Sequence, residues 1–447
     1  MPDNIIELTP FRADLTRALT RRGERLLAAT DLAAEVAGLE PLEAYYIVRE
    51  IGLDQALPVL LALSPEQLTA CVDLGCWERH DFAVDSLDEW LNAFALAGAE
   101  TLARTFFGLD YVVQLLFLTQ TVTVYDPDTD QIPEVDEEQA ESRAVTPDGF
   151  YLLELKSNAP LKLHPFTLLD ALYQYDPVAA YQLLGQVRVD LPTQIEEEAL
   201  HFRNGRMQDL GFVTPDEAAV LFSRPGRQQP LPRPKHPMDS AATRVPSVYA
   251  GPLIENTLLQ QALSLVTDQE CLARLEQEIV WAINSAIIAY GEKTQDIDQV
   301  TAIAERVRDT ISLGLEALLS QSNGEIPPDD ASSVAQAAQL LELWCITDLF
   351  RHGFAATLGL KQAAQQAMRE PAFRAWYELP ESEQSDAPGD RLERAFVTAL
   401  LGRQPMRSGF DLADAEQVKA FAHLDEINVA QVRLQRLATR LSRQGNH

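Results

Sequence analysis

The sequence has few cysteines, few basic residues and no long apolar run, and each absence narrows the class of protein. Four cysteines in 447 residues are too few and too scattered for a disulfide framework, which favours free thiols in a reducing cytoplasm. The longest weakly polar stretch, 279–290, is interrupted by Asn284 and Ser285. Because it is shorter than the roughly 20 residues that span a bilayer, it predicts a buried helix and no membrane insertion.

Positive charge is scarce throughout the chain. Asp and Glu number 67 against 36 Lys and Arg, which gives a formal net charge of -31. A field of this sign repels phosphate backbones and anionic lipid, so we expect no nucleic-acid partner and no binding to a membrane surface. The first ten residues are acidic and polar where a signal peptide needs a basic end and an apolar run, so we expect a cytoplasmic protein.

Helix starts of the form Ser/Thr-Pro-x-Glu/Gln recur along the chain. At 64–67 and 214–217 a hydroxyl can accept the N3 amide, proline fits the first helical position, and the N3 side chain can bond back to the cap. Ser86 followed by Glu89 predicts another start ahead of Trp90. These signals predict many short amphipathic helices.

The first half of the chain predicts stacked helices with one interruption. Narrow apolar faces follow one another from 14 to 120, and each would need its neighbours for burial, as in helical-repeat proteins. Between 121 and 155, alternating β-formers predict a small β-hairpin insertion, although the same apolar run could open a helix. Helices resume from 167 to 223, so we predict a helical-repeat domain over 1–223.

Residues 224–252 are rich in proline and contain Arg224, Arg227, Arg233, Lys235 and Arg244. This composition predicts a basic linker, or an arm that presents Pro-x-x-Pro-like segments to a partner. Longer helical patterns follow and predict a helical bundle over 253–447. The predicted fold class is therefore all-α: a stacked helical-repeat array with a small β-hairpin insertion, followed by a helical bundle.

Two resemblances accompany this organisation. Residues 40–126 are similar to the helical-repeat domain that precedes the membrane part of bacterial magnesium transporters. The motifs at 51–54 and 63–68 carry this resemblance. Residues 124–126, 146–150 and 201–212 resemble a bacterial, mainly delta-proteobacterial, family catalogued only as a domain of unknown function. The second resemblance spans most of the chain and implies a bacterial cytoplasmic helical protein, without an activity or a site.

An acidic loop offers one candidate metal site. Asp126, Asp128, Asp130 and Glu137 occupy the first, third, fifth and twelfth places of a calcium-loop spacing. Gln131 stands at the sixth place, where the sharp turn needs glycine. A solvated acidic loop and a specific cation site are therefore both open.

A polar cluster offers one candidate ligand site, formed by Arg203, Asn204, Arg206 and Asp209. Two guanidinium groups could hold a carboxylate or a phosphate in bidentate fashion. The alternative is an ion pair within the chain, with a carboxylate of the acidic run at 196–198 as partner.

Three further patterns could mark a site or could have an ordinary structural explanation. Cys71, Cys76 and His80 lack the fourth ligand of a structural zinc site, which favours core cysteines. Asp348 and His352 lie one helical turn apart without a nucleophile, which favours an i,i+4 pair. The arginines of the last helix either bind a partner or form a solvated face near the helix C-terminus; they are Arg433, Arg436, Arg440 and Arg443.

No catalytic motif with the spacing that its chemistry needs is found, so no catalytic residue and no cofactor is predicted. We expect a cytoplasmic scaffold or regulatory protein that binds protein partners through a concave or grooved surface of the array, with a homo-oligomer as one possibility. The alternative is an enzyme or ligand sensor that binds a small anion or a divalent cation between the helical halves.

Overall fold

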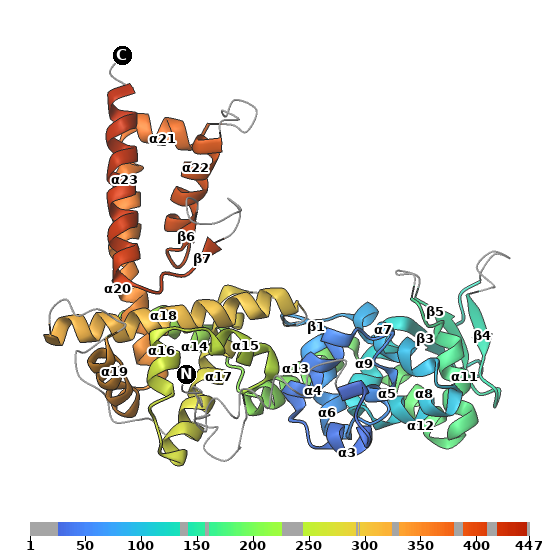
Figure 1. Cartoon of the computed structure of the whole chain (residues 1–447). Coiled ribbons are helices and arrows are strands. Elements are labelled where there is room, and N and C mark those ends of the chain that lie inside the picture. Colours follow the sequence, from blue (N-terminus) through green and yellow to red (C-terminus); the bar gives the residue numbers. More distant parts are fainter. Residues whose placement is uncertain are drawn as a thin grey trace. The chain divides into compact units, whose positions relative to one another are not determined.

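The computed structural model describes residues 26–134, 142–156, 161–225, 245–291, 294, 296–323, 330–379, 388–408 and 418–444. These residues form two compact units. The array unit lies within Thr20–Gly211 and Lys293–Ile297, and the bundle unit lies within Phe212–Glu292 and Asp298–His447 (Figure 1). Both units are mainly helical, so the predicted all-α class with a small β insertion is confirmed.

The array unit consists of short helices with brief connections. Helix α4 packs against α6, α8 packs against α11, and α9 packs against α13. Each helix therefore buries its apolar face against neighbours in the stack. The helices are α3 (Leu32–Ala37), α4 (Pro41–Ile51), α5 (Leu57–Leu60), α6 (Pro65–Gly75), α7 (Val84–Ala95), α8 (Ala99–Gly108), α9 (Tyr111–Thr121), α11 (Pro165–Tyr175), α12 (Pro177–Val189) and α13 (Pro192–Asp209).

The predicted start at 64–67 is confirmed and the start at Ser86 is wrong. The Ser64 hydroxyl accepts a hydrogen bond from Gln67 N at 3.2 Å, and Gln67 Oε1 accepts one from Ser64 N at 2.8 Å. Helix α7 begins earlier than predicted, at Val84, so Ser86 lies inside its first turn. Asp88 there accepts hydrogen bonds from Lys162 N and Leu163 N, so a distant segment uses this carboxylate.

A three-stranded antiparallel sheet interrupts the helices, in the order β3-β5-β4. Strand β3 (Val122–Tyr125) pairs with β5 (Leu152–Leu155), and β4 (Arg143–Val145) covers the other edge of β5. Of the two alternatives that the sequence left open for this run, strands and a helix, the strands form, and β4 is a strand beyond the predicted hairpin. Two short antiparallel strands of two residues each, β1 (Trp77–Glu78) and β2 (Asp81–Phe82), follow α6.

The bundle unit contains longer helices. Two of them, α17 and α18, each bury an apolar face. The elements are α14 (Pro215–Ala219), η1 (Val220–Phe222), α15 (Ser247–Ile254), α16 (Leu258–Leu263), α17 (Gln269–Tyr290), α18 (Ile297–Asn323), α19 (Ala331–Leu343), α20 (Ile346–Ala367), α21 (Pro371–Tyr377), α22 (Pro388–Leu401), β6 (Arg407–Ser408), β7 (Val418–Lys419) and α23 (Leu424–Gln444).

The second compact unit begins at Phe212. Helix α14 packs on α17, and the Phe222 ring contacts the rings of Tyr290, Phe350 and Phe354. Aromatic burial thus assigns 212–222 to the second unit. Helix α15 forms at the end of the predicted linker, where Tyr249 is fully buried; residues 226–244 lie outside the described residues.

Helices α18 and α20 cross at a glycine contact. A Cβ atom on Gly353 would lie 1.9 Å from the Thr310 carbonyl oxygen, and one on Gly314 would lie 1.9 Å from the Leu349 carbonyl oxygen. Only glycine permits this backbone approach. The crossing fixes α20, whose C-terminal half then supports the last three helices.

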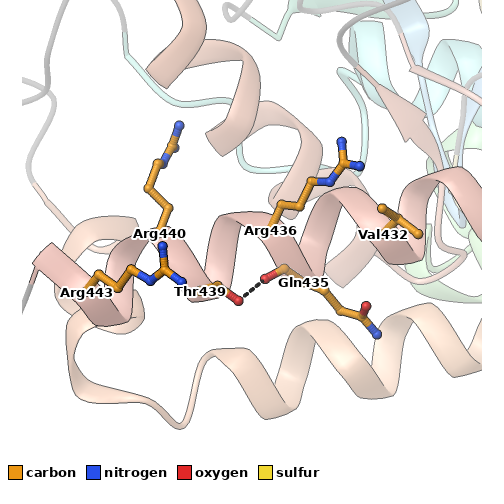
Figure 2. A pocket seen from close by; sticks show the side chains of 6 residues that line it. All are labelled: Val432, Gln435, Arg436, Thr439, Arg440 and Arg443. Atoms are coloured by element: carbon orange, nitrogen blue, oxygen red, sulfur yellow. Dashed lines mark hydrogen bonds between the residues drawn. The ribbon is translucent and has the colours of Figure 1, made fainter.

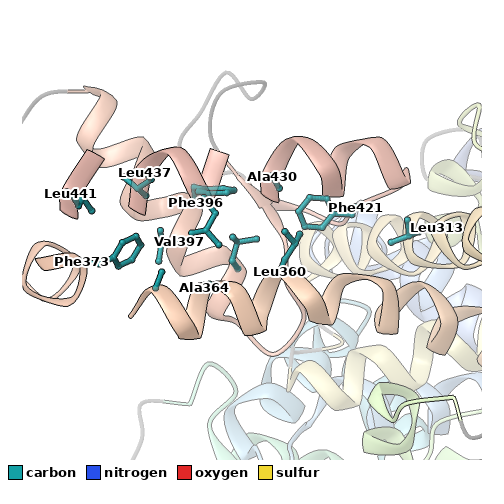
Figure 3. Close-up of a cluster of buried hydrophobic side chains, with 13 residues drawn as sticks. Leu313, Leu360, Ala364, Phe373, Phe396, Val397, Phe421, Ala430, Leu437 and Leu441 are labelled. Atoms are coloured by element: carbon teal, nitrogen blue, oxygen red, sulfur yellow. The ribbon is translucent and has the colours of Figure 1, made fainter. Parts of the chain in front are cut away.

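A separate apolar cluster joins α20 to α21, α22 and α23 (Figure 3). Leucines on one face of α23 project into it, beside aromatic residues of α21, α22 and the segment before α23. Helix α23 is therefore amphipathic, with a fixed inner face. The buried members are Leu313, Leu360, Ala364, Ala367, Phe373, Phe396, Val397, Leu400, Phe421, Ala430, Leu434, Leu437 and Leu441.

Within the described part of the chain, no single helix combines the length and the apolar composition that a membrane crossing requires. Helices α8 and α9 meet those criteria only as a pair, and they bend by 116° at their junction.

Candidate functional site

One face of helix α12 brings together exposed aromatic residues and the acidic loop. Asp176 caps the N-terminus of the helix, where its carboxylate accepts hydrogen bonds from Val178 N and Ala179 N. Val178, Tyr181, Gly185 and Arg188 recur every three or four residues, which places them on one stripe of the helix. Tyr181 contacts the aromatic residues that follow the β4–β5 turn, and Arg188 contacts the acidic loop after β3.

The aromatic part of the surface contains Phe150, Tyr151 and Tyr181. The Phe150 and Tyr181 ring centroids lie 5.3 Å apart in an edge-to-face arrangement, and the Tyr151 ring stacks on Tyr181 at 5.2 Å. Phe150 is 61% exposed and Tyr181 is 40% exposed, whereas Tyr151 is buried. Burial raises the pKa of Tyr151 to about 12. Tyr181 thus contacts both other rings, with the buried Tyr151 stacked on it and the exposed Phe150 packed against its edge.

The turn that presents Phe150 is closed by its own hydrogen bonds. Gly149 N donates to the Thr146 carbonyl oxygen at 2.8 Å, and Gly149 has a φ of 80°, which glycine adopts without strain. Asp148 Oδ1 accepts hydrogen bonds from the Thr146 hydroxyl and from Phe150 N. The exposed ring therefore stands on a defined turn.

Arg188 closes the acidic loop. Its Nε and one terminal nitrogen donate to the two carboxylate oxygens of Asp130 at 2.8 and 2.9 Å, and the same terminal nitrogen donates to the Thr129 hydroxyl. Asp126 Oδ2 lies 3.8 Å from this guanidinium. The hydrogen bond from Arg188 lowers the pKa of Asp130 to about 2. The guanidinium thus supplies the positive charge that a cation would bring.

Among the described residues, no group of three or more His, Cys, Asp or Glu is placed to hold a metal ion. Asp126 and Asp130 share Arg188, Asp128 is exposed, and Glu137 lies outside the described residues. The cation site over these four positions stays a prediction. A metal ion there would have to compete with Arg188 for the Asp130 carboxylate.

We define the aromatic–acidic surface as Phe150, Tyr181 and Val178 together with Asp126 and Asp128. Val178 is 64% exposed and lies one turn before Tyr181. Exposed aromatic residues beside charged residues are typical of protein interfaces, in which aromatic side chains contribute much of the binding energy. The carboxylates on one side would favour a partner with basic residues at the rim.

The cluster around Arg206 is occupied by contacts within the array unit. Arg206 donates to both oxygens of Asp73, at 2.6 and 2.9 Å, and to Asp110 Oδ2 at 2.8 Å. Burial raises the pKa of Asp73, and hydrogen bonding to Asp73 raises the pKa of Arg206. The carboxylate partners are thus Asp73 and Asp110 and not the acidic run at 196–198. An added anion would have to displace them.

Arg203 is likewise engaged. Its guanidinium donates to the Asp73 and Arg79 carbonyl oxygens and lies 5.1 Å from the centroid of the Trp77 ring. Burial lowers its pKa to about 10. Asn204 and Asp209 are exposed on α13. The geometry gives the two arginines a structural role, and ligand binding by this set of four residues stays a prediction.

The residues of the other sequence patterns contact residues of the same unit or lie in the core. Cys71 and Cys76 are buried, and burial raises the pKa of both thiols. Asp348 accepts a hydrogen bond from Arg351 at 2.8 Å. The His352 ring packs edge-on against Trp344, and burial lowers the pKa of His352.

Sequence reasoning missed the aromatic–acidic surface. It used Phe150 and Tyr151 only as strand residues, and it gave Tyr181 no role. The available signal was the close succession of a turn and two aromatic residues at 146–151. The pairing of Phe150 with Tyr181, however, depends on packing between segments that are 31 residues apart.

Fold and surface define a class: acidic, mainly helical proteins with a small antiparallel sheet inserted in a helical array. Within it, the chain belongs to a family of unknown function, DUF6178, whose model matches residues 11–442. The expected membership of a family without an assigned function is thus confirmed. No curated protein and no solved structure matches the chain, so the similarity of 40–126 to magnesium transporters stays a resemblance.

Proposed function

We propose that this protein is a cytoplasmic scaffold or regulatory protein that binds another protein through the aromatic–acidic surface. The observation that carries the proposal is the pair of exposed rings, Phe150 and Tyr181, which contact each other while Tyr181 also stacks on the buried Tyr151. Rigid aromatic side chains lose little entropy on binding, which is why they dominate protein interfaces.

The chemistry of the surface favours a partner of a particular kind. Phe150, Tyr181 and Val178 offer an apolar centre, and Asp126 and Asp128 add negative charge beside it. A partner with an apolar contact patch and Arg or Lys at its rim would complement both parts. The buried thiols of Cys71 and Cys76, which form no disulfide, are compatible with a reducing cytoplasm, and this supports the proposed location.

The proposal is tested by cross-linking the full chain in native lysate, identifying the partner and reconstituting the purified pair. We expect the double substitution Phe150→Ala and Tyr181→Ala to weaken the complex by at least about tenfold, since each ring is an interface anchor. A matched control replaces two exposed aromatic residues outside this surface, Tyr111 and Phe202. This control is expected to bind as the unchanged protein does.

Two results would count against the proposal. One is a protein that stays monomeric and recovers no stoichiometric partner. The other is a complex that forms equally well with the double variant and with the control. Light scattering on the purified chain separates a heterologous partner from a second copy, because only self-association changes its mass in the absence of other proteins.

A further inference from the structure

Helix α23 has a basic outer face that nothing in the described part of the bundle unit neutralises. Its inner face is fixed by Leu434, Leu437 and Leu441 in the apolar cluster. The outer side lines an open cavity of about 680 Å³ (Figure 2). The residues that line the cavity are Val432, Gln435, Arg436, Thr439, Arg440 and Arg443.

The four arginines of α23 fall into two groups. Arg433 is engaged: it donates to Glu393 Oε2 at 3.1 Å and to the Ser408 carbonyl oxygen, and it lies 4.2 Å from the Phe396 ring centroid. Arg436, Arg440 and Arg443 are exposed, and within the described residues no carboxylate lies within ion-pair distance of them. The helix thus uses Arg433 for packing, and the other three arginines have no carboxylate partner in the part of the chain that the structure describes.

This charge is unusual in its setting. The chain has a net charge of -31, yet no Asp or Glu follows Glu426. An arginine that is exposed and forms no ion pair contributes little to the packing of the fold. Each guanidinium keeps its donors available for bidentate contact with carboxylates.

The spacing of the three charges fits a helix. Arg436 and Arg440 lie one turn apart, about 6 Å along the axis, and Arg443 follows after about 4.5 Å. Carboxylates at i and i+4 of a second helix have the same rise as the first pair. Val429 and Val432, which are 68% and 44% exposed, continue the stripe toward the N-terminus. One end of the face is apolar and the other is basic.

We propose that the basic face of α23, defined as Val429, Val432, Arg436, Arg440 and Arg443, binds an acidic amphipathic helix of a partner protein. Two observations favour a protein segment over a nucleic acid. The valines call for apolar side chains in the partner, and a long polyanion is repelled by the rest of the chain. A short acidic helix brings few charges and can place leucines on Val429 and Val432.

The test measures fluorescence anisotropy of a labelled 16-residue peptide with the full chain. In the peptide, Glu recurs at i and i+4, and Leu occupies the adjoining helical positions. We expect saturable binding with a Kd below about 100 μM near 50 mM salt, and weaker binding at about 300 mM, because salt screens exposed charges. A peptide with Gln in place of each Glu is expected to bind at least about tenfold more weakly, because its amides carry no charge for the arginines.

Charge-matched variants locate the site. The double substitution R436A and R440A should weaken peptide binding by about tenfold, whereas R104A with R369A, which changes the net charge equally, should leave the Kd within about twofold. Both control arginines are exposed. V432S should weaken binding by about threefold, the effect of losing one apolar contact. Should R436A with R440A lose helix content by circular dichroism, R436Q with R440Q takes its place.

Several results would overturn the inference. They are the absence of saturable binding to the folded chain, equal losses in the two double variants, equal affinity for the Gln peptide, and tighter binding of a 16-nucleotide single-stranded DNA. The aromatic–acidic surface does not enter this test. A negative result in the peptide test therefore does not contradict the proposed function. A negative result for the proposed function likewise does not contradict the binding of an acidic helix to α23.

Discussion

Two arginine clusters, one on α13 and one on α23, look alike in sequence and differ in structure. Each places basic residues at helical spacing near a helix C-terminus. On α13, Arg206 forms hydrogen bonds with Asp73 and Asp110. On α23, Arg436 and Arg440 are exposed. The difference lies in carboxylates far away along the chain, since Asp73 is 133 residues from Arg206.

This comparison teaches that a local basic pattern identifies neither a binding site nor a structural ion pair. The decisive quantity is the number of guanidinium donors already used within the fold. An arginine that is engaged inside its unit should affect stability, and a free one should affect binding. Variants of single arginines can test this separation, and we order them by expected effect.

The largest effect is expected for Arg206→Ala. The Asp73 side chain is 1% exposed, and Arg206 is 28% exposed. Removing the arginine leaves a buried carboxylate without its main partner, which costs about 3 kcal/mol, the lower end for buried pairs because Arg206 is partly solvated. We expect the melting temperature of the array unit to fall by about 6 to 12 °C. Hydrogen exchange of the α6 and α13 amides should report the loss locally.

The matched control for that substitution removes both charges. Asp73→Leu together with Arg206→Met should destabilise the unit less than Arg206→Ala alone, because no unpaired charge is then buried. A loss below about 0.5 kcal/mol in the single variant, the range of ordinary surface substitutions, would show that the α13 cluster is not structural. The comparison with α23 would then fail.

Arg433→Ala tests the comparison within one helix. Arg433 is 15% exposed and combines an ion pair with Glu393 and a contact with the Phe396 ring. Charge-assisted hydrogen bonding and the cation–π contact together predict a loss of about 2 kcal/mol. Thermal unfolding of the full chain, followed by hydrogen exchange in α22 and α23, measures it. Wild-type stability in this variant would erase the distinction between Arg433 and Arg436.

Local signals predicted much of the fold. The capping boxes at Ser64 and Thr214 involve atoms only three residues apart, so the sequence alone specifies them. The alternating run at 122–125 predicted a strand for a similar reason, because its period is visible within a few residues. Helix α7 is the exception. It begins at Val84, so the pattern at 86–89 lies inside the helix, and Asp88 bonds to backbone amides about 75 residues away.

The surfaces could not be predicted in the same way. Phe150 meets Tyr181 only after α12 has packed on the sheet at β3, and Arg188 reaches Asp130 across 58 residues. The Gly353 approach to the Thr310 carbonyl also joins two separate helices. Such contacts depend on tertiary geometry, which hydrophobic periodicity does not encode. The sequence therefore identified Asp126, Asp128 and Asp130 as an acidic group without identifying Arg188 as the residue that binds it.

Arg188→Gln is expected to raise the pKa of Asp130 and to have a small effect on the free energy of unfolding at neutral pH. The folded pKa of about 2 lies below the ordinary value of 3.8. The carboxylate therefore contributes stability that is fully present above the ordinary value and is lost as the pH falls through about 2. Without the guanidinium, the pKa should rise toward 3.8, and acid unfolding should begin at higher pH. A carbon-13 titration of the Asp130 carboxyl measures the shift.

The same variant also sharpens the prediction of a cation site. With Arg188 removed, Asp126, Asp128 and Asp130 lose their internal counterion, so a divalent cation meets less competition. Calcium should then shift the melting temperature of Arg188→Gln more than that of the unchanged chain. An unchanged Asp130 pKa in the variant would contradict the assignment of Arg188 as its main partner.

Arg440→Ala is expected to have the smallest effect on stability. The side chain is exposed, lies one turn from the like charge of Arg436, and has no partner among the described residues. Its removal should change the free energy of unfolding by less than about 0.5 kcal/mol, with slight stabilisation from the relieved repulsion. Thermal melts against Arg433→Ala on the same helix provide the measurement. A loss comparable to that of Arg433→Ala would mean that Arg440 is engaged within the fold, and α23 would then resemble α13.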